Sequence, residues 1–117
     1  MERKFRLTRS TEFQRVRREG RSYAHPLLVL VACQDADPAS LRVGITASRA
    51  VGNAVQRNRA KRRIRACFQS FIPEIPPGWN LIVIARKPTL QANFDEIKKA
   101  AASLLKRAGL LVKPNGT

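Results

Sequence analysis

The sequence predicts a single α/β (α+β) domain, a two-layer sandwich with the element order αβββαβα and a mixed four-stranded sheet. Three observations support this fold class. The chain has 117 residues, which suits one domain of ordinary size. Short apolar runs rich in β-branched residues alternate with segments whose apolar residues recur at helical spacing. One helical segment lies between two strand-like runs, which predicts a strand–helix–strand unit.

The first part of the chain predicts a helix followed by an extended segment. Residues 1–7 are rich in arginine and lysine and have little to bury, so we expect a flexible basic arm that orders on RNA. Residues 8–19 show helical spacing, and Gly20 is placed to end that helix. The extended segment 23–33 contains Pro26, which confines its first part to a sheet edge or a bulge.

Two further strands are expected in the middle of the chain. Residues 27–32 are apolar at every position, which is typical of a central strand covered on both faces. Residues 41–48 form the next strand, after a short polar connection. A connection of this length most naturally joins a hairpin, so we expect these two strands to be neighbours.

The following segment predicts a helix with one apolar and one cationic face. Gly52 breaks the extended run, and Asn53 is a good N-cap for a helix that begins at Ala54. Arg57 and Arg63 flank the apolar stripe, where long side chains can cover apolar surface. The stripe itself contains Ala60, Ile64, Cys67, Phe68 and Phe71. The opposite face carries Asn58, Lys61, Arg62 and Arg65.

The charge of this helix favours an RNA-binding surface over a solvated basic face. Residues 49–65 carry seven lysines and arginines and no acid, and no Asp or Glu occurs between Asp37 and Glu74. Like-charge pairs at i,i+4 each disfavour an isolated helix by roughly 0.2–0.5 kcal/mol. A polyanion would reverse the sign of that energy, because an arginine guanidinium can donate two parallel hydrogen bonds to phosphate.

The last third of the chain predicts one strand and one helix. Residues 79–85 are rich in β-branched side chains, and Arg86 and Lys87 follow this strand with two more cations. Apolar residues then recur at helical spacing across 94–108. Residues 112–117 are expected to form a flexible tail.

Composition narrows the class of partner. The formal net charge is +15 and the sequence pI is about 11.6, which is typical of a nucleic-acid binder. No secretory signal is present and no apolar run is long enough to cross a bilayer, so we expect a cytoplasmic protein without a membrane partner. The two cysteines lie in apolar patterns and are expected to be small buried side chains.

The residues do not assemble a protein active site. The sequence offers no paired catalytic carboxylates, no His/Cys ligand cluster, no Walker-type loop and no Ser/His/Asp set. We therefore expect no catalytic residue and no metal ligand in this chain.

The motif of the basic helix is specific in its order and spacing. It reads Val51-Gly52-Asn53-Ala54-Val55, then Arg57-Asn58-Arg59, Lys61-Arg62 and Arg65. This motif resembles the signature of the bacterial ribonuclease P protein family. The resemblance continues through Glu12-Phe13-Gln14-Arg15-Val16, Leu41-Arg42-Val43-Gly44 and residues 81–86, and it covers nearly the whole chain.

The resemblance implies the protein subunit of a ribonucleoprotein that removes the 5′ leader of precursor tRNA. In that family the RNA subunit and its bound Mg²⁺ perform the hydrolysis, which agrees with the expected lack of a protein active site. The resemblance also implies a left-handed crossover around the basic helix, as in a related ribosomal protein domain, against the usual right-handed rule. It further implies a monomeric protein, one copy per RNA.

Two RNA-contacting surfaces follow from the resemblance. The first, here named the signature surface, faces the catalytic RNA and contains Arg49, Asn53, Arg57, Asn58, Arg59, Lys61, Arg62 and Arg65. The second, the leader cleft, lies between the first helix and the sheet and is expected to be lined by Phe13, Arg17, Val31, Arg86 and Lys87.

The chain departs from the family pattern at three of its positions. Arg17 and Val31 stand where relatives often carry aromatic residues, so leader contact would rely less on stacking and more on charge. Ala50 stands where a second cation is common, so one phosphate contact is expected to be absent.

Two other functions remain open at this point. A general RNA-binding protein, ribosome-associated or an RNA chaperone, would use the same charge without a role in cleavage. An autonomous nuclease would have to cleave RNA without an RNA subunit. Affinity for precursor tRNA that is lost when the leader is trimmed distinguishes the subunit from the general binder.

Overall fold

One mixed sheet with helices on both faces forms the structure, a computed structural model that describes residues 1–111. In chain order the elements are α1 (Ser10–Glu19), β1 (Arg21–Ala24), β2 (Leu28–Gln34), β3 (Leu41–Ala47), α2 (Ala54–Phe71), β4 (Trp79–Ala85) and α3 (Phe94–Arg107). This order confirms the predicted αβββαβα arrangement and the strand–helix–strand unit around the basic helix. The tail expected at 112–117 lies outside the described residues.

The strand order in the sheet is β1-β2-β4-β3, so the predicted hairpin between β2 and β3 is wrong. β4 lies between them, antiparallel to β2 and parallel to β3. The connection from β2 to β3 crosses the start of β4, where the backbone N–H groups of Gly78 and Trp79 donate to the carbonyl of Ser40. β2 instead forms its hairpin with β1, the edge strand that Pro26 follows.

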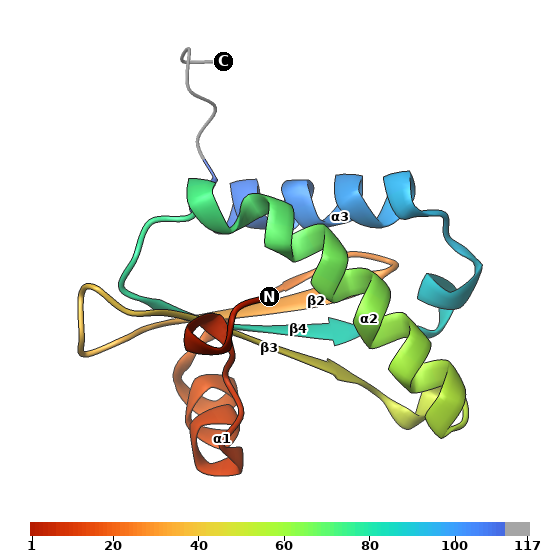
Figure 1. Cartoon of the computed structure of the whole chain (residues 1–117), viewed down its shortest axis with the longest axis horizontal. Helices are drawn as coiled ribbons and strands as arrows, with labels where there is room; N and C mark the ends of the chain where they lie inside the picture. The colour runs from red at the N-terminus through yellow and green to blue at the C-terminus, as the bar shows by residue number, and fades with distance from the viewer. Residues whose placement is uncertain (112–117) are drawn as a thin grey trace.

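The larger core lies between the sheet and helices α2 and α3, which cover the same face (Figure 1). All five residues of the predicted apolar stripe on α2 are buried in it. Capping boxes begin both helices: Asn53 Oδ1 accepts from the backbone N–H of Gln56 at 2.9 Å, and Asn93 and Glu96 repeat the pattern. The sequence thus sets both where α2 begins and which of its faces is buried.

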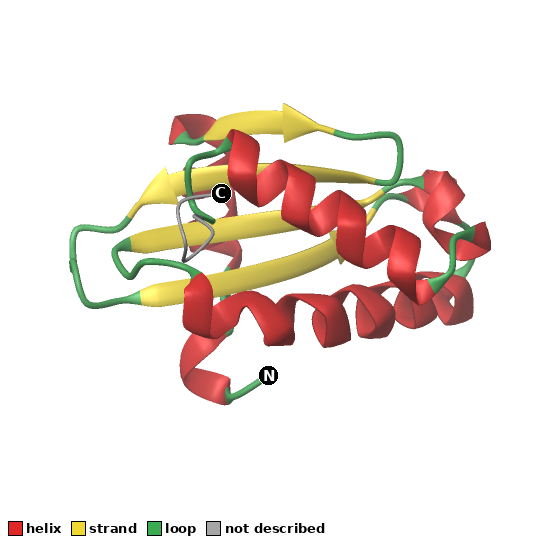
Figure 2. Cartoon of the chain, turned by 90° about the horizontal axis from the view of Figure 1, so that it is seen from above, coloured by secondary structure: helices red, strands yellow, loops and turns green. Residues whose placement is uncertain are grey.

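Helix α1 lies on the opposite face and covers only part of it (Figures 1 and 2). The two-layer description therefore holds for α2 and α3 on the sheet, and α1 adds a partial third layer. A smaller core beneath α1 contains Leu7, Val16, Val31, Cys33 and Ile82. β2 is covered on both faces as a result, which confirms the reading of its continuous apolar run.

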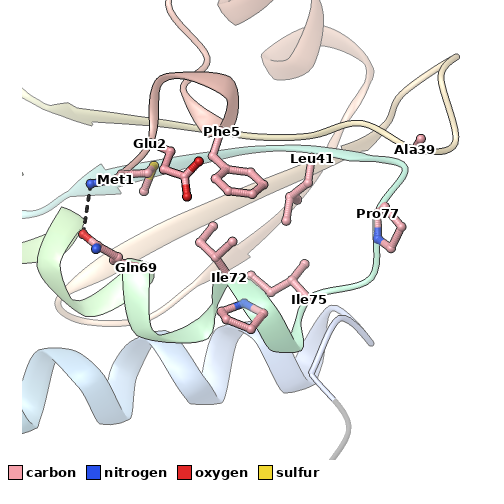
Figure 3. Close-up of a pocket in the computed structure, with 10 residues that line it drawn as sticks. Met1, Glu2, Phe5, Ala39, Leu41, Gln69, Ile72, Ile75 and Pro77 are labelled. Atoms are coloured by element: carbon pink, nitrogen blue, oxygen red, sulfur yellow. Dashed lines mark hydrogen bonds between the residues drawn. The ribbon is translucent and has the colours of Figure 1, made fainter.

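The N-terminal segment is packed against the domain, which differs from the flexible arm expected there. The backbone N–H of Leu7 donates to the carbonyl of Val43 on the outer edge of β3 at 3.0 Å, and Leu7 is buried. Phe5 lines an open apolar pocket of about 500 Å³ together with Ile72 and Ile75 (Figure 3). The terminal amine of Met1 donates to Gln69 Oε1 of α2 at 2.9 Å.

Within residues 1–111, none of the helices combines the length and the apolar character that crossing a membrane would require.

Gly20 permits the close approach of α1 to β2. Its φ of −81° is ordinary, so the requirement is space rather than backbone conformation. A Cβ there would lie 2.5 Å from the carbonyl oxygen of Val16 and 2.8 Å from Cγ1 of Val31. The carbonyl oxygen of Ala32 in β2 would lie 2.9 Å from the same Cβ. Because a backbone oxygen cannot move aside cheaply, any side chain at this position forces α1 away from the sheet.

We expect Gly20→Ala to lower the free energy of unfolding by about 1–3 kcal/mol, the usual cost of overpacking. Urea unfolding followed by circular dichroism measures the change. Ser22→Ala, in the exposed strand beside it, serves as the control and should stay within about 0.5 kcal/mol of wild type. Equal stability of Gly20→Ala and wild type would contradict this account of how α1 is seated.

Candidate RNA interface

The structure gathers the residues of the signature surface around the first half of α2. Asn53 is the N-cap, and a short 3-10 turn over Arg49–Val51 places Arg49 just before it. Gly52 between them has a φ of 144°, a backbone conformation that residues other than glycine rarely adopt. Exposed members of the surface are Arg49, Asn53, Asn58, Arg59 and Arg62, whereas Arg57, Lys61 and Arg65 are half-buried.

The cations of the signature surface have no acidic partner. Across residues 1–111, every ion pair is made by other residues. Arg57 donates to the carbonyl oxygen of Gly52 at 3.0 Å, which orients its guanidinium without neutralising it. The surface therefore presents uncompensated positive charge, held in place by the buried stripe on the other side of the helix.

Arg63 on the same helix has a different role. Its guanidinium donates to the carbonyl oxygens of Thr89, at 3.2 Å, and of Ala92. Both acceptors lie at the short turn η4 (Lys87–Gln91) and its end. Arg63 thus ties α2 to the segment that follows β4, which explains why this cation does not join the signature surface.

Phe13, expected to line the leader cleft, lies between α1 and the face of the sheet that α1 partly covers. The Phe13 ring lies over Gly44 of β3, where an added Cβ would overlap it. Val29 and Ile84 lie beside Phe13 at the edge of the small core and are partly exposed. Arg17 is exposed on the last turn of α1.

Val31 does not line this cleft, so its assignment there is wrong. Its side chain is 3% exposed and packs under α1 against Val16 and Ile82. Val29, two residues earlier in β2 and on the same face of the strand, occupies the open position instead. The alternation of faces along a strand could have suggested Val29, but only the placement of α1 decides which of the two is covered.

Arg86 and Lys87 are exposed at the end of β4. Arg86 donates to the carbonyl oxygen of His25 at 3.2 Å and lines an open hollow with Ala24 and Pro26. These two cations therefore lie beside the β1–β2 turn, and η4, which begins at Lys87, also contacts the turn at Arg49–Val51 that precedes α2. Their position leaves them available to an anion that follows the open face.

A polar cluster that sequence reasoning missed joins α1 to the sheet. Arg42 of β3 pairs with Glu12 of α1 at 2.8 Å and with Asp35 of the β2–β3 connection at 3.7 Å. The backbone N–H of Asp37 donates to Asp35 Oδ1 at 2.9 Å. This bond holds the pKa of Asp35 below its usual value, with further help from Asn80 and Arg42 and against the effect of burial.

The cysteines are buried and free, as expected. Burial raises the pKa of the Cys67 thiol, while the nearby charges of Lys98 and Arg63 act in the opposite direction. In the part of the chain that the structure describes, no three His, Cys, Asp or Glu side chains come together as a metal site would require.

Comparison with known proteins identifies the family. The Ribonuclease P family model matches residues 1–109. The ribonuclease P protein component of Oceanobacillus iheyensis is 38% identical over 111 residues, which cover 95% of this chain and 92% of the relative. That of Chloroflexus aurantiacus is 39% identical over 115 residues, covering 97% and 84% respectively.

Solved structures agree with the sequence comparison. The RNase P protein of Staphylococcus aureus superposes with a TM-score of 0.82 at 33% identity, covering 92% of this chain and 97% of that protein. The Thermotoga maritima RNase P protein, solved with 1-(4-fluorophenyl)-2-thiourea, gives a TM-score of 0.76 at 30% identity, covering 87% and 98%. The chain therefore belongs to the ribonuclease P protein component family, whose members are the protein subunit in tRNA 5′ processing.

Proposed function

We propose that the signature surface of this ribonuclease P subunit binds the catalytic RNA and that the leader cleft holds the 5′ leader of precursor tRNA. The observation that carries the proposal is the uncompensated charge around the first half of α2. The cations of that region have no acidic partner among residues 1–111, although the same chain pairs Arg42 with two acids. RNA phosphates supply the missing counter-charge.

Hydrolysis is assigned to the RNA subunit, with Mg²⁺ held by RNA rather than by this protein. The acids of the described chain support this division, because several of them already serve the fold. Glu12 and Asp35 pair with Arg42, and Glu96 completes the capping box of α3. We further propose that one monomeric protein serves each RNA.

The protein contributes through differential binding. Its cations reduce the repulsion between two large polyanions, the catalytic RNA and precursor tRNA, and so lower the Mg²⁺ concentration that assembly requires. Contacts to the leader are made by the precursor and lost in the product. The enzyme consequently prefers precursor over mature tRNA without any protein group acting on the scissile bond.

The cleft has features that suit a single strand of RNA. Phe13 supplies an aromatic ring and Val29 and Ile84 supply partly exposed apolar surface on which bases can rest. Arg17 and Arg86 lie exposed at the surface, where they can meet phosphates. With one aromatic at this site, we expect charge to contribute more than stacking to leader binding.

The double variant Arg57→Ala/Arg59→Ala tests the signature surface. Loss of two charge-assisted contacts should weaken binding to a bacterial ribonuclease P RNA about 10- to 100-fold, or about 1.4–2.7 kcal/mol. Precursor-tRNA cleavage at low Mg²⁺ should fall in parallel, and added Mg²⁺ should restore it. Filter binding and single-turnover cleavage measure the two effects.

Lys98→Ala/Lys99→Ala is the matched control, because it removes two exposed cations from α3 instead. If both double variants lose affinity equally, binding follows net charge and the signature surface is not the contact. If wild type binds the RNA but adds nothing to correct 5′ cleavage, a general RNA-binding role replaces the cleft proposal.

Salt dependence gives an independent test of the number of phosphate contacts. If about six phosphates are neutralised, log K should fall with log[salt] at a slope of roughly −4 to −5, at about 0.7–0.9 per contact. Arg57→Ala/Arg59→Ala should reduce the size of that slope by about 1.4–1.8. A nearly flat dependence for the wild-type protein would show that the cations do not contact phosphate.

A further inference from the structure

The ion pairs of Arg42 differ from the others in what they connect. Among residues 1–111, the remaining pairs each lie within one helix or one short segment. Arg42 instead joins β3 to Glu12 of α1 and to Asp35 of the connection between β2 and β3. In the described chain, the ion pairs that join separate elements are therefore those of Arg42, and one of them attaches α1 to the sheet.

The geometry of the contact with Glu12 is well defined. Arg42 Nη1 donates to both carboxylate oxygens, at 2.8 Å to Oε2 and 3.1 Å to Oε1. The Arg42 side chain is 35% exposed and that of Glu12 21%, so solvent and salt screen this pair less than a fully exposed one. On its other side Arg42 faces Asp35, which the backbone of Asp37 holds in place.

The apolar attachment of α1 is narrow by comparison. Val16 is the buried residue of this helix, and the small core beneath it holds few side chains. Val16 and the partly buried Phe13 give this helix a short apolar contact with the sheet. Glu12 precedes Val16 by one helical turn and lies on the same side, so a second contact at Glu12 fixes the direction of the helix axis.

This second contact also determines where Phe13 sits. Arg42 and Gly44 are two residues apart in β3 and point to the same face of the sheet. They meet consecutive residues of α1, because Arg42 holds Glu12 and Gly44 lies under the ring of Phe13. A shift of Glu12 away from Arg42 would lift the Phe13 ring off Gly44 and change the wall of the leader cleft.

We propose that Arg42 and Glu12 are positioning residues for leader binding: their ion pair sets the orientation of α1 and with it the width of the leader cleft. The inference rests on the proposed function, in which the leader occupies that cleft. In this inference Arg42 acts through Glu12 rather than on RNA, because its Nη1 donates to Glu12 and its Nη2 faces Asp35 at 3.7 Å.

The test compares precursor and mature tRNA binding by the reconstituted holoenzyme. The readout is the ratio of the two dissociation constants, which isolates the leader contribution. Glu12→Gln, Arg42→Gln and the double variant should each reduce the ratio by about three- to tenfold, the range expected for a partly buried pair. The double variant should lose no more than Arg42→Gln alone, because each single variant already removes the contact between Arg42 and Glu12.

Affinity for the catalytic RNA alone should stay within about twofold of wild type in all three variants, because α2 does not depend on this pair. Loss of fold would lower that affinity as well, so the comparison separates positioning from unfolding. Asp95→Asn, which removes an exposed pair within α3, is the matched control and should leave the ratio unchanged. If a glutamine variant fails to fold, Glu12→Asp replaces it, because the shorter acid withdraws from Arg42 and should still lower the ratio.

Four results would overturn the inference. Additive losses in the double variant would mean that the two residues act separately. A higher preference for precursor in Glu12→Gln would mean that a released Arg42 binds the leader directly. An unchanged ratio in every variant, while wild type prefers precursor, would reject the positioning role and leave the leader cleft intact. If wild type shows no preference for precursor, the leader cleft itself fails, and the inference fails with it.

Discussion

The burial of one face of α2 is the constraint on which the arrangement of this protein depends. Five residues from Ala60 to Phe71 enter the main core, so the helix cannot rotate to hide its cations. Repulsion among those cations disfavours the helix in isolation, and core packing offsets it. The capping box at Asn53 then fixes where the helix starts. The residues proposed to bind phosphate consequently stand on a helix that the main core holds in place.

Helix α1 is attached to the sheet by much less apolar packing than α2. It has one buried residue, Val16, and gains a second attachment through charge, at Glu12. Because it covers only part of its face of the sheet, it leaves an open surface beside Phe13. The two helices thus have different proposed roles: α2 presents its fixed charge to the catalytic RNA, and α1 borders the proposed leader cleft, where its ion pair with Arg42 sets its orientation.

The sequence could predict features that depend on neighbours along the chain. The pattern of apolar residues located α2, α3 and the strands β2, β3 and β4, and Asn53 marked a helix start through a contact three residues away. Features that depend on distant partners were missed. A short connection suggested a β2–β3 hairpin, whereas β4 enters between these strands from more than thirty residues later. Val31 was placed in the cleft through the family resemblance, and no local signal tells which end of β2 lies under α1.

The N-terminal segment shows the same limit. In the sequence, Phe5 and Leu7 stand alone in a basic stretch. In the structure, the backbone of Leu7 bonds to Val43 of β3, and Phe5 lines a pocket with Ile72 at the end of α2. Arg42 likewise looked like an ordinary strand cation, since its partner Glu12 lies 30 residues earlier. Pairing across such separations depends on how the sheet and helices come together, which residue spacing does not encode.

Site-specific cross-linking of the assembled holoenzyme tests the central claim most directly. Cys33 and Cys67 are buried, so a photo-crosslinker can be attached selectively to the thiol of Val55→Cys, beside the signature surface, or of Ala24→Cys, beside the leader cleft. The account predicts that the first cross-links to the catalytic RNA and the second to leader nucleotides of precursor tRNA. Cross-links from Val55→Cys to the leader, or from both positions to the same RNA segment, would contradict it.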